Sequence, residues 1–307
     1  MIEKINLKIK AVPKYSMLGL VHTFVLITPR SISYYHDILE KIRDNPYFIE
    51  AWQFHNNVLS LASIAVVPIE AISYLYDFIE TFKLAEHIRV YTTQTPYPFL
   101  PDFTQYNIAN TYWEYTTGDF SHNYDKIYLP DDPRSFKLLV DKIDLEIIKK
   151  LHKDASIKMS TIAKQLNISR PRVKYHYDNH VHPILLDRYA VVFSRFNEPT
   201  IYTILYTLFK SKSDLAKAIA FLSRGPFLHY ICKEIKKQGA IFLLEIPRRS
   251  LEDLLYNYLK ALDKNTRIKR YFYLILGKKI FERNISTNLF DNKRWNVDIF
   301  LRKTTTK

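Results

Sequence analysis

Residues 140–173 read VDKIDLEIIKKLHKDASIKMSTIAKQLNISRPRV and contain two amphipathic helical patterns, a turn, and the start of a third helix. The first pattern predicts a helix over about 142–153, with inward residues Ile143, Ile147, Ile148 and Leu151. The second predicts a helix over about 159–166, with inward residues Ile162, Ala163 and Leu166. Three helices therefore fit this stretch and the residues that follow it.

The turn before the third helix is encoded by Asn167, Ile168 and Ser169. We expect a tight turn at Asn167-Ile168, buried through Ile168. Ser169 then serves as the N-cap, because its hydroxyl can accept a free backbone N–H. Pro171 lies in the first turn of the helix, where its missing N–H costs little, and Val173 is expected to face the core. The pattern is that of a helix-turn-helix.

This helix-turn-helix, residues 141–182, resembles that of the Lrp/AsnC (feast/famine) family of transcriptional regulators. The resemblance rests on D-x-I-D-x-x-I-I-x-x-L-x-x-D-A from residue 141 and on I-A-x-x-L-x-I-S-x-x-x-V from residue 162. That family follows its helix-turn-helix with a βαββαβ effector and oligomerisation domain. The resemblance therefore implies a DNA-binding regulator with such a domain after residue 182.

The third helix is the expected reader of duplex DNA, and it would enter the major groove. Arginine can make bidentate contacts to guanine and asparagine to adenine, whereas lysine contacts to phosphate give affinity without sequence information. The predicted DNA-binding residues are Ser169, Arg170, Arg172, Lys174, Tyr175, Asn179 and Lys164. Lys174 and Lys164 are the expected phosphate contacts. The alternative is a vestigial helix-turn-helix whose charges are merely solvated.

A βαββαβ pattern precedes the helix-turn-helix. Strands are predicted at 20–27, 50–55, 58–67 and 87–93, and amphipathic helices at 31–43 and 69–82. The turn between the second and third strands is His55-Asn56-Asn57, where asparagine tolerates positive φ. This order of elements is typical of the ferredoxin-like fold.

The same order recurs after the helix-turn-helix. Strands are predicted at 201–209, on both sides of a turn at Gln238-Gly239, and at 267–276, with helices at 213–222 and 251–262. At an offset of 182 residues the two copies match Ile27 with Phe209, Ser31 with Ser213, Ile69 with Leu251, Tyr74 with Tyr256, Tyr76 with Tyr258, Asn110 with Asn292 and Trp113 with Trp295. We infer an internal duplication.

The predicted fold is α+β, a central winged helix-turn-helix flanked by two ferredoxin-like βαββαβ domains. These domains are expected to form an intramolecular pseudo-dimer, because each sheet has one open apolar face. The expected division of the chain is 1–95 and 196–280 for the two ferredoxin-like domains, 96–137 for a connector, 138–195 for the helix-turn-helix domain and 281–307 for a tail.

The duplication also predicts what stands before the first copy. At the same offset, a first helix-turn-helix would end at the start of the chain, so we expect that reading head to be lost or encoded upstream. Ile5 to Pro13 would then correspond to the connecting strand near Asp187 to Arg195. With one reading head per chain, binding a two-fold DNA site requires a homodimer.

The net charge of +14 is concentrated in the second half of the chain. Residues 1–117 carry a net charge of −2, residues 141–182 carry +4, and residues 183–307 carry +13. A basic half joined to a slightly acidic half favours a polyanionic partner such as duplex DNA. The alternative is a lysine-rich surface of the kind found in thermophile proteins.

Other classes of protein are disfavoured by composition. The one cysteine, Cys232, excludes an internal disulfide framework and a multi-thiolate zinc site, and none of the five glycines forms a nucleotide-phosphate loop. We see neither a signal peptide nor a membrane span, and expect a cytoplasmic protein with no membrane partner. No cofactor is predicted. The hairpin 237–240 lacks the Asp of the amino-acid-binding members of the family, so any small-molecule effector is of unknown identity.

His176 and His180 lie four residues apart on a predicted helix, with His182 close by, and this spacing can grip a metal ion. The sequence offers no carboxylate or thiolate that completes a good site, so we expect no metal and a simply exposed or phosphate-contacting pair.

Two other classes of function stay open. Siroheme decarboxylases resemble this architecture and bind a tetrapyrrole, which implies His229, Arg248 and Arg249 of the second copy as loose candidates for that role. The other class is a protein-interaction module with a vestigial helix-turn-helix.

Overall fold

The computed structural model describes residues 7–56, 58–101, 103–107, 112–113, 132–133, 138–193, 195–196 and 198–301. The chain divides into two compact units, the first made of residues 1–95, 133–193 and 278–307, the second of residues 96–132 and 194–277. The helix-turn-helix thus belongs to the same unit as the first βαββαβ copy. No described helix is both long enough and apolar enough to cross a lipid bilayer. Ile5, Asn57 and Asn110, named above, lie outside the described residues.

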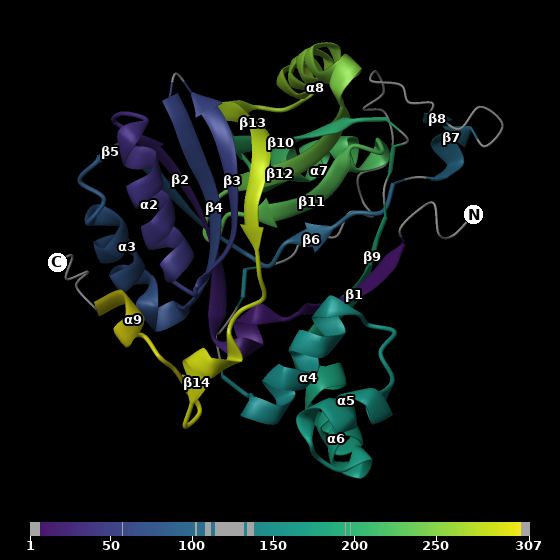
Figure 1. Cartoon of the computed structure of the whole chain (residues 1–307). Helices are drawn as coiled ribbons and strands as arrows, with labels where there is room; N and C mark the ends of the chain where they lie inside the picture. Colours follow the sequence, from purple (N-terminus) through teal and green to yellow (C-terminus); the bar gives the residue numbers. More distant parts are fainter. Residues whose placement is uncertain are drawn as a thin grey trace. The chain divides into compact units, whose positions relative to one another are not determined.

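The first unit contains a four-stranded antiparallel sheet in the order β5-β2-β4-β3. Its strands are β2 (Leu20–Pro29), β3 (Phe48–Asn56), β4 (Val58–Pro68) and β5 (Ala85–Thr93). Helices α2 (Ser33–Asp44) and α3 (Ile72–Glu80) lie on one face of this sheet (Figure 1). The apolar stripe of α2 is buried there, as its periodicity predicts, through Tyr35, Ile38, Leu39 and Ile42.

The second unit repeats this topology, with strand order β13-β10-β12-β11. The strands are β10 (Thr200–Phe209), β11 (Leu228–Lys233), β12 (Gly239–Pro247) and β13 (Ile268–Glu282), and the helices are α7 (Lys212–Arg224) and α8 (Leu251–Asn265). Strand β6 (Tyr97–Pro98) of the connector pairs with the free edge of β11. The apolar side chains of α7 and α8 form one core with β10 and β12. The predicted ferredoxin-like order is confirmed in both copies, and their pairing as a pseudo-dimer stays a prediction.

Bulges occur at equivalent places in the two sheets and define which residues correspond. Register shifts fall between Thr28 and Pro29 on β2 and between Leu208 and Phe209 on β10. After the third strand of each copy, at Pro68 and Pro247, a short 3-10 helix begins: η2 (Ile69–Ala71) and η6 (Arg248–Ser250). The offset is therefore 180 residues in the first strand and 179 in the third.

The predicted matches of Ile27 with Phe209, Ile69 with Leu251, Tyr74 with Tyr256 and Tyr76 with Tyr258 are thus wrong by two or three residues. The copies differ in loop length, and loops tolerate insertions that shift a constant offset. The turn of the second hairpin is also displaced, because Lys236 has the positive φ of 62° and Gly239 already belongs to β12.

The segments that follow each copy form matching tryptophan hairpins. One comprises β7 (Tyr106–Asn107) and β8 (Tyr112–Trp113), the other β14 (Phe290–Asp291) and β15 (Arg294–Trp295). The Trp113 indole N–H donates to the Arg195 carbonyl at 2.8 Å, just before β10, and the Trp295 indole donates to the Leu18 carbonyl at 2.8 Å, just before β2. The predicted match of Trp113 with Trp295 is confirmed. Each unit therefore combines one copy with the segment that follows the other copy.

Candidate nucleic-acid interface

The helix-turn-helix consists of α4 (Lys142–Lys153), α5 (Met159–Leu166) and α6 (Arg170–His176), which agree with the predicted spans for the first two helices. Its core is formed by buried side chains from all three helices: Leu145, Ile147, Ile148, Leu151, Ile162, Ala163 and Val173. Ile143, Leu166 and Ile168, expected to be buried, are only half-buried. Leu145, which was not predicted to face inward, is buried.

Two caps fix where the first and third helices begin. Asp141 and Asp144 form a reciprocal capping box on α4, since the Asp144 N–H donates to Asp141 Oδ1 at 2.9 Å and the Asp141 N–H donates to Asp144 Oδ2 at 3.0 Å. Ser169 is the N-cap of α6 as predicted, and its Oγ accepts from the Arg172 N–H at 3.4 Å. The predicted turn is present at Asn167, which adopts the left-handed conformation with a φ of 53°.

The third helix of the helix-turn-helix differs from the prediction after His176. A π-helix, η5 (Tyr177–Leu185), follows α6 directly and contains Pro183. Proline lacks the N–H that an α-helix would use at this position, so regular α-helical bonding cannot continue through it. Asn179, predicted on the same α-helix as Arg170 and Arg172, therefore lies on this wider turn. Its direction relative to the two arginines differs from that in a regular α-helix.

All seven predicted DNA-binding side chains are exposed. Within the described part of the chain, the guanidinium groups of Arg170 and Arg172 make no hydrogen bond or ion pair. Two others are engaged locally, because Lys174 Nζ lies 3.5 Å from the Asp178 carboxylate and the Asn179 amide donates to the Tyr175 carbonyl at 2.8 Å. Arg170 and Arg172 are thus the cationic groups of α6 most available to a ligand.

A two-stranded ribbon joins the helix-turn-helix to the first copy. Strand β1 (Lys8–Pro13) pairs antiparallel with β9 (Leu186–Val192), the two segments predicted to correspond under the duplication. The Ala155 N–H donates to the Ile9 carbonyl at 2.9 Å, and His152 Nδ1 donates to the Ala11 carbonyl at 2.8 Å. This ribbon stands where the wing of a winged helix-turn-helix is expected.

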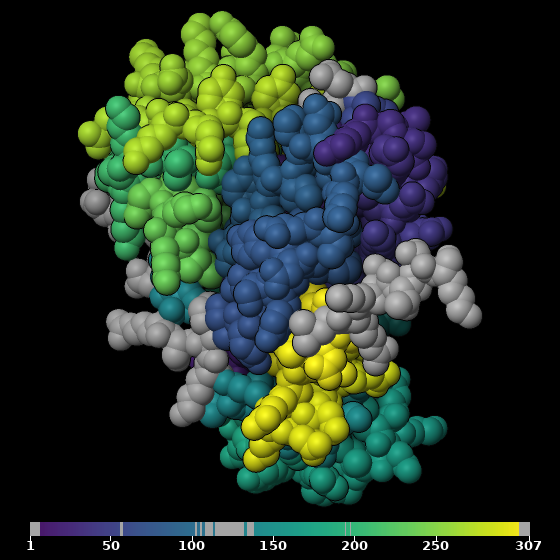
Figure 2. Space-filling view, turned by 90° about the vertical axis from the view of Figure 1, so that its left-hand side faces the viewer, coloured from purple at the N-terminus to yellow at the C-terminus, as the bar shows by residue number. Residues whose placement is uncertain are grey.

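The C-terminal segment of the first unit adds a second attachment. Thr287 Oγ1 donates to the Glu146 carboxylate of α4, and Trp295 holds the Leu18 carbonyl before β2. In Figure 2 this segment, in yellow, lies between the teal helix-turn-helix and the blue part of the first copy. The helix-turn-helix is therefore attached to the rest of the first unit at two places.

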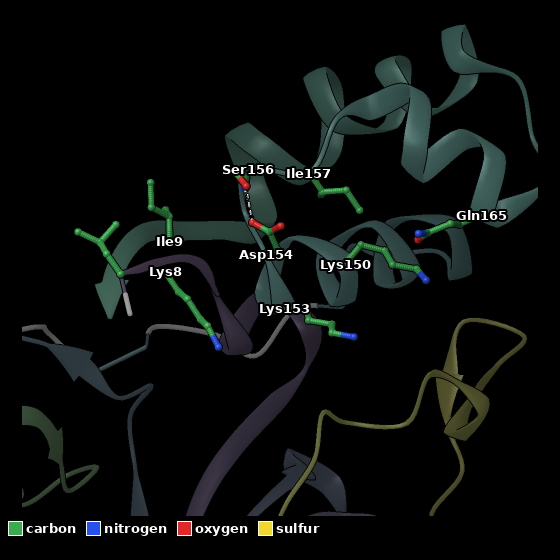
Figure 3. Close-up of a pocket in the computed structure, with 9 residues that line it drawn as sticks. Lys8, Ile9, Lys150, Lys153, Asp154, Ser156, Ile157 and Gln165 are labelled. Carbon is green, nitrogen blue, oxygen red and sulfur yellow. Dashed lines mark hydrogen bonds between the residues drawn. The ribbon is translucent and has the colours of Figure 1, made fainter. Parts of the chain in front are cut away.

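A groove of about 690 Å³ lies between β1 and the helix-turn-helix (Figure 3). Lys8 and Ile9 come from β1, whereas Lys150, Lys153 and Gln165 come from α4 and α5. Asp154 also lines the groove, and its carboxylate accepts hydrogen bonds from the backbone N–H and the hydroxyl of Ser156. These hydrogen bonds lower the pKa of Asp154. The groove therefore presents three lysines, which sequence reasoning did not single out.

The structure corrects the expectation that no carboxylate accompanies His176 and His180. Asp144 lies between them, with its Oδ1 2.8 Å from His176 Nδ1 and 3.2 Å from His180 Nδ1. Asp141 is also close, with its Oδ2 3.6 Å from His176 Nδ1. We refer to the four side chains as the His/Asp cluster: Asp141, Asp144, His176 and His180.

Comparisons with known proteins give one family model and several similar solved structures. The family model for the winged helix-turn-helix DNA-binding domain matches residues 140–179. The crystal structure of the siroheme decarboxylase NirDL matches with a TM-score of 0.58 and 9% identity, over 98% of this chain and 84% of that one. NirDL with an iron-uroporphyrin III analogue matches with a TM-score of 0.56 and 9% identity, over 98% and 83%. E. coli AsnC matches with a TM-score of 0.37 and 17% identity, over 48% and 98%.

No curated protein matches the sequence. The similarity to NirDL, at 9% identity, shows a shared fold. The predicted α+β fold, with a winged helix-turn-helix and two ferredoxin-like copies, is thus confirmed, and the family model confirms the predicted helix-turn-helix over residues 140–179.

Proposed function

We propose that this chain is a sequence-specific DNA-binding transcriptional regulator and not an enzyme, and that it reads the major groove with α6. The observation that carries the proposal is the placement of Arg170 and Arg172 at the start of α6. Both are exposed and make no side-chain hydrogen bond or ion pair within the described residues of a winged helix-turn-helix. Such arginines suit bidentate contacts to guanine O6 and N7.

The other predicted residues take supporting roles in this proposal. Ser169 and Lys164 suit contacts to the DNA phosphates beside the major groove. Lys174 would exchange its ion pair with Asp178 for a phosphate, at small cost because both side chains are exposed. Asn179 would read adenine only after releasing the Tyr175 carbonyl, so we assign it less weight than the arginines.

A dimer of chains fits the same proposal. One reading head per chain can contact one half of a two-fold site, so two chains are required to occupy both halves.

The test is a salt titration of the full chain binding to fluorescently labelled random duplex DNA. We expect a plot of the logarithm of the binding constant against the logarithm of the salt concentration to have a slope of about −3 or steeper. The reason is that several phosphate contacts release counterions. The double variant Lys164→Gln/Lys174→Gln should flatten that slope by about 2.

The matched control is Lys264→Gln/Lys269→Gln, which removes the same charge from exposed positions of the other unit. This control should keep the wild-type slope. A wild-type protein that fails to bind duplex DNA at low salt would refute the proposal, and a protein-interaction role would then become the better account.

The shared fold with NirDL favours tetrapyrrole binding as a second candidate function. Of the side chains that could bind a tetrapyrrole, His229 lies 4.0 Å from the Glu245 carboxylate and stacks on Tyr202. Arg249 Nε forms an ion pair with the Glu198 carboxylate at 2.9 Å. An absorption spectrum after incubation with an iron tetrapyrrole separates the two candidates. A Soret band that shifts in His229→Ala would favour tetrapyrrole binding. No change in the tetrapyrrole spectrum when protein is added would rule tetrapyrrole binding out.

A further inference from the structure

The His/Asp cluster joins two helices that are far apart in sequence. Asp141 and Asp144 lie at the start of α4, whereas His176 ends α6 and His180 lies in the first turn of η5. Each of the four side chains offers one ligand atom, and these atoms all lie within 4.8 Å of one another. The cluster is therefore a contact between the first helix of the helix-turn-helix and the far end of its reading helix.

Three separations between ligand atoms of the cluster are close to those around a small metal ion. Zn²⁺ bound tetrahedrally at about 2.0–2.1 Å places its ligand atoms about 3.3 Å apart. The separations from Asp144 to the two imidazoles are 2.8 and 3.2 Å, and that from Asp141 to His176 is 3.6 Å. The longer separations involve Asp141 and His180, which are 42% and 35% exposed and so have room to adjust.

The charges and the donor atoms point to the same class of ion. Two carboxylates and two neutral imidazoles carry a charge of −2, which a divalent cation neutralises. Imidazole nitrogen suits Zn²⁺ and its neighbours in the first transition row, whereas Ca²⁺ and Mg²⁺ prefer all-oxygen sites. On one side of the cluster the side chains are buried, with Asp144 1% exposed and His176 9% exposed. Asp141 and His180 leave a path of entry on the other side.

We infer that the His/Asp cluster is a binding site for one divalent transition-metal ion, with Zn²⁺ as the ion that its geometry fits best. The ion binds each Nδ1 in place of the proton otherwise donated to Asp144, and each neutral imidazole then carries its one proton on Nε2. The ion thereby ties α4 to the end of α6. The ring of Tyr175, a predicted DNA contact, lies edge-on to both imidazoles with centroids 5.7 Å away. Metal binding therefore acts at the back of the surface proposed to meet DNA, and the site itself does not depend on that proposal.

Calorimetric titration of the metal-free full chain with Zn²⁺ tests this inference, together with visible absorption after titration with Co²⁺ as a spectroscopic substitute. We expect one ion per chain and the d–d absorption of a tetrahedral nitrogen-and-oxygen site. His180→Gln should weaken Zn²⁺ binding by at least about 100-fold, since even loss of an outer partner of a metal ligand costs about 10- to 100-fold.

The matched control is His182→Gln, an exposed histidine two residues further along the same helix. It should bind Zn²⁺ like the wild type, and Zn²⁺ should raise the melting temperature of the wild type and this control but not of His180→Gln. Because His180 is partly exposed and outside the capping box, His180→Gln should keep the wild-type circular dichroism spectrum. Absence of one-to-one binding, or equal affinity in His180→Gln and wild type, overturns the inference.

Discussion

Replacing Arg195 with alanine is expected to lower the free energy of unfolding by about 3–5 kcal/mol, because three carbonyl groups lose a charged donor together. Nη1 of Arg195 donates to the carbonyls of Pro226, at 2.8 Å, and Leu228, and Nη2 donates to that of Phe99. The residue is only 6% exposed, and burial lowers the pKa of its guanidinium to about 10, which leaves it charged at neutral pH. Urea unfolding of the full chain at pH 7.5 measures the loss.

The control for this variant is Arg249→Ala, which removes an exposed arginine paired with Glu198 in the same unit. An exposed ion pair contributes about 0–1 kcal/mol, so this change should be small. The Trp113 indole binds the Arg195 backbone carbonyl, so that contact survives in both variants. Equal stability of Arg195→Ala and Arg249→Ala would contradict the role assigned to the buried guanidinium.

The second large effect is an acid-induced loss of stability from His22. Burial lowers the pKa of His22 to about 3, and within the described residues its Nδ1 has no hydrogen-bond partner. Below the ordinary histidine pKa of 6.5, the unfolded chain takes up a proton that the folded chain does not bind until about pH 3. The free energy of unfolding therefore keeps its full contribution from His22 above pH 6.5. Below pH 6.5 it falls as the pH falls, by up to about 1.36 kcal/mol per pH unit.

Between pH 7 and 5 this single group should cost about 2 kcal/mol, measured by denaturant unfolding at each pH. His22→Phe should remove that part of the pH dependence, because phenylalanine fills a similar space against the Tyr15 ring and binds no proton. The exposed His87→Gln should keep the wild-type profile. A His22→Phe protein with the full acid loss of the wild type would show that other groups cause it, of which His152, whose pKa burial also lowers, is the first to examine.

Local sequence signals predicted most of the helix-turn-helix. The apolar spacing of α4 and α5 and the serine N-cap of α6 act within one or two helical turns, so a single sequence is enough to place them. The π-helix was not predicted, although Pro183 marks a position through which regular helical bonding cannot continue. Asp141 and Asp144 carried a visible capping-box spacing, and reading it would have placed two carboxylates at the start of α4.

Contacts over long sequence distances could not be predicted in this way. His176 meets Asp144 across 32 residues, and Trp295 meets Leu18 across 277. Such contacts depend on how finished elements pack, which periodicity within one element does not encode. The order of elements was therefore enough to predict the repeat. A single offset of 182 residues did not predict which residues correspond, because the loops of the two copies differ in length.

Sequence-specific reading of DNA by α6 is tested most directly by selecting binding sites for the full chain from a pool of random duplexes. The wild type should enrich one motif that contains guanine in each half-site. Arg170→Ala/Arg172→Ala should lose that enrichment, and its preference for the motif over random sequence should fall at least about 30-fold. Arg248→Ala, an exposed arginine in the other unit, should enrich the wild-type motif. A folded wild-type protein that enriches no sequence, or a double variant that enriches the same motif, would contradict this account.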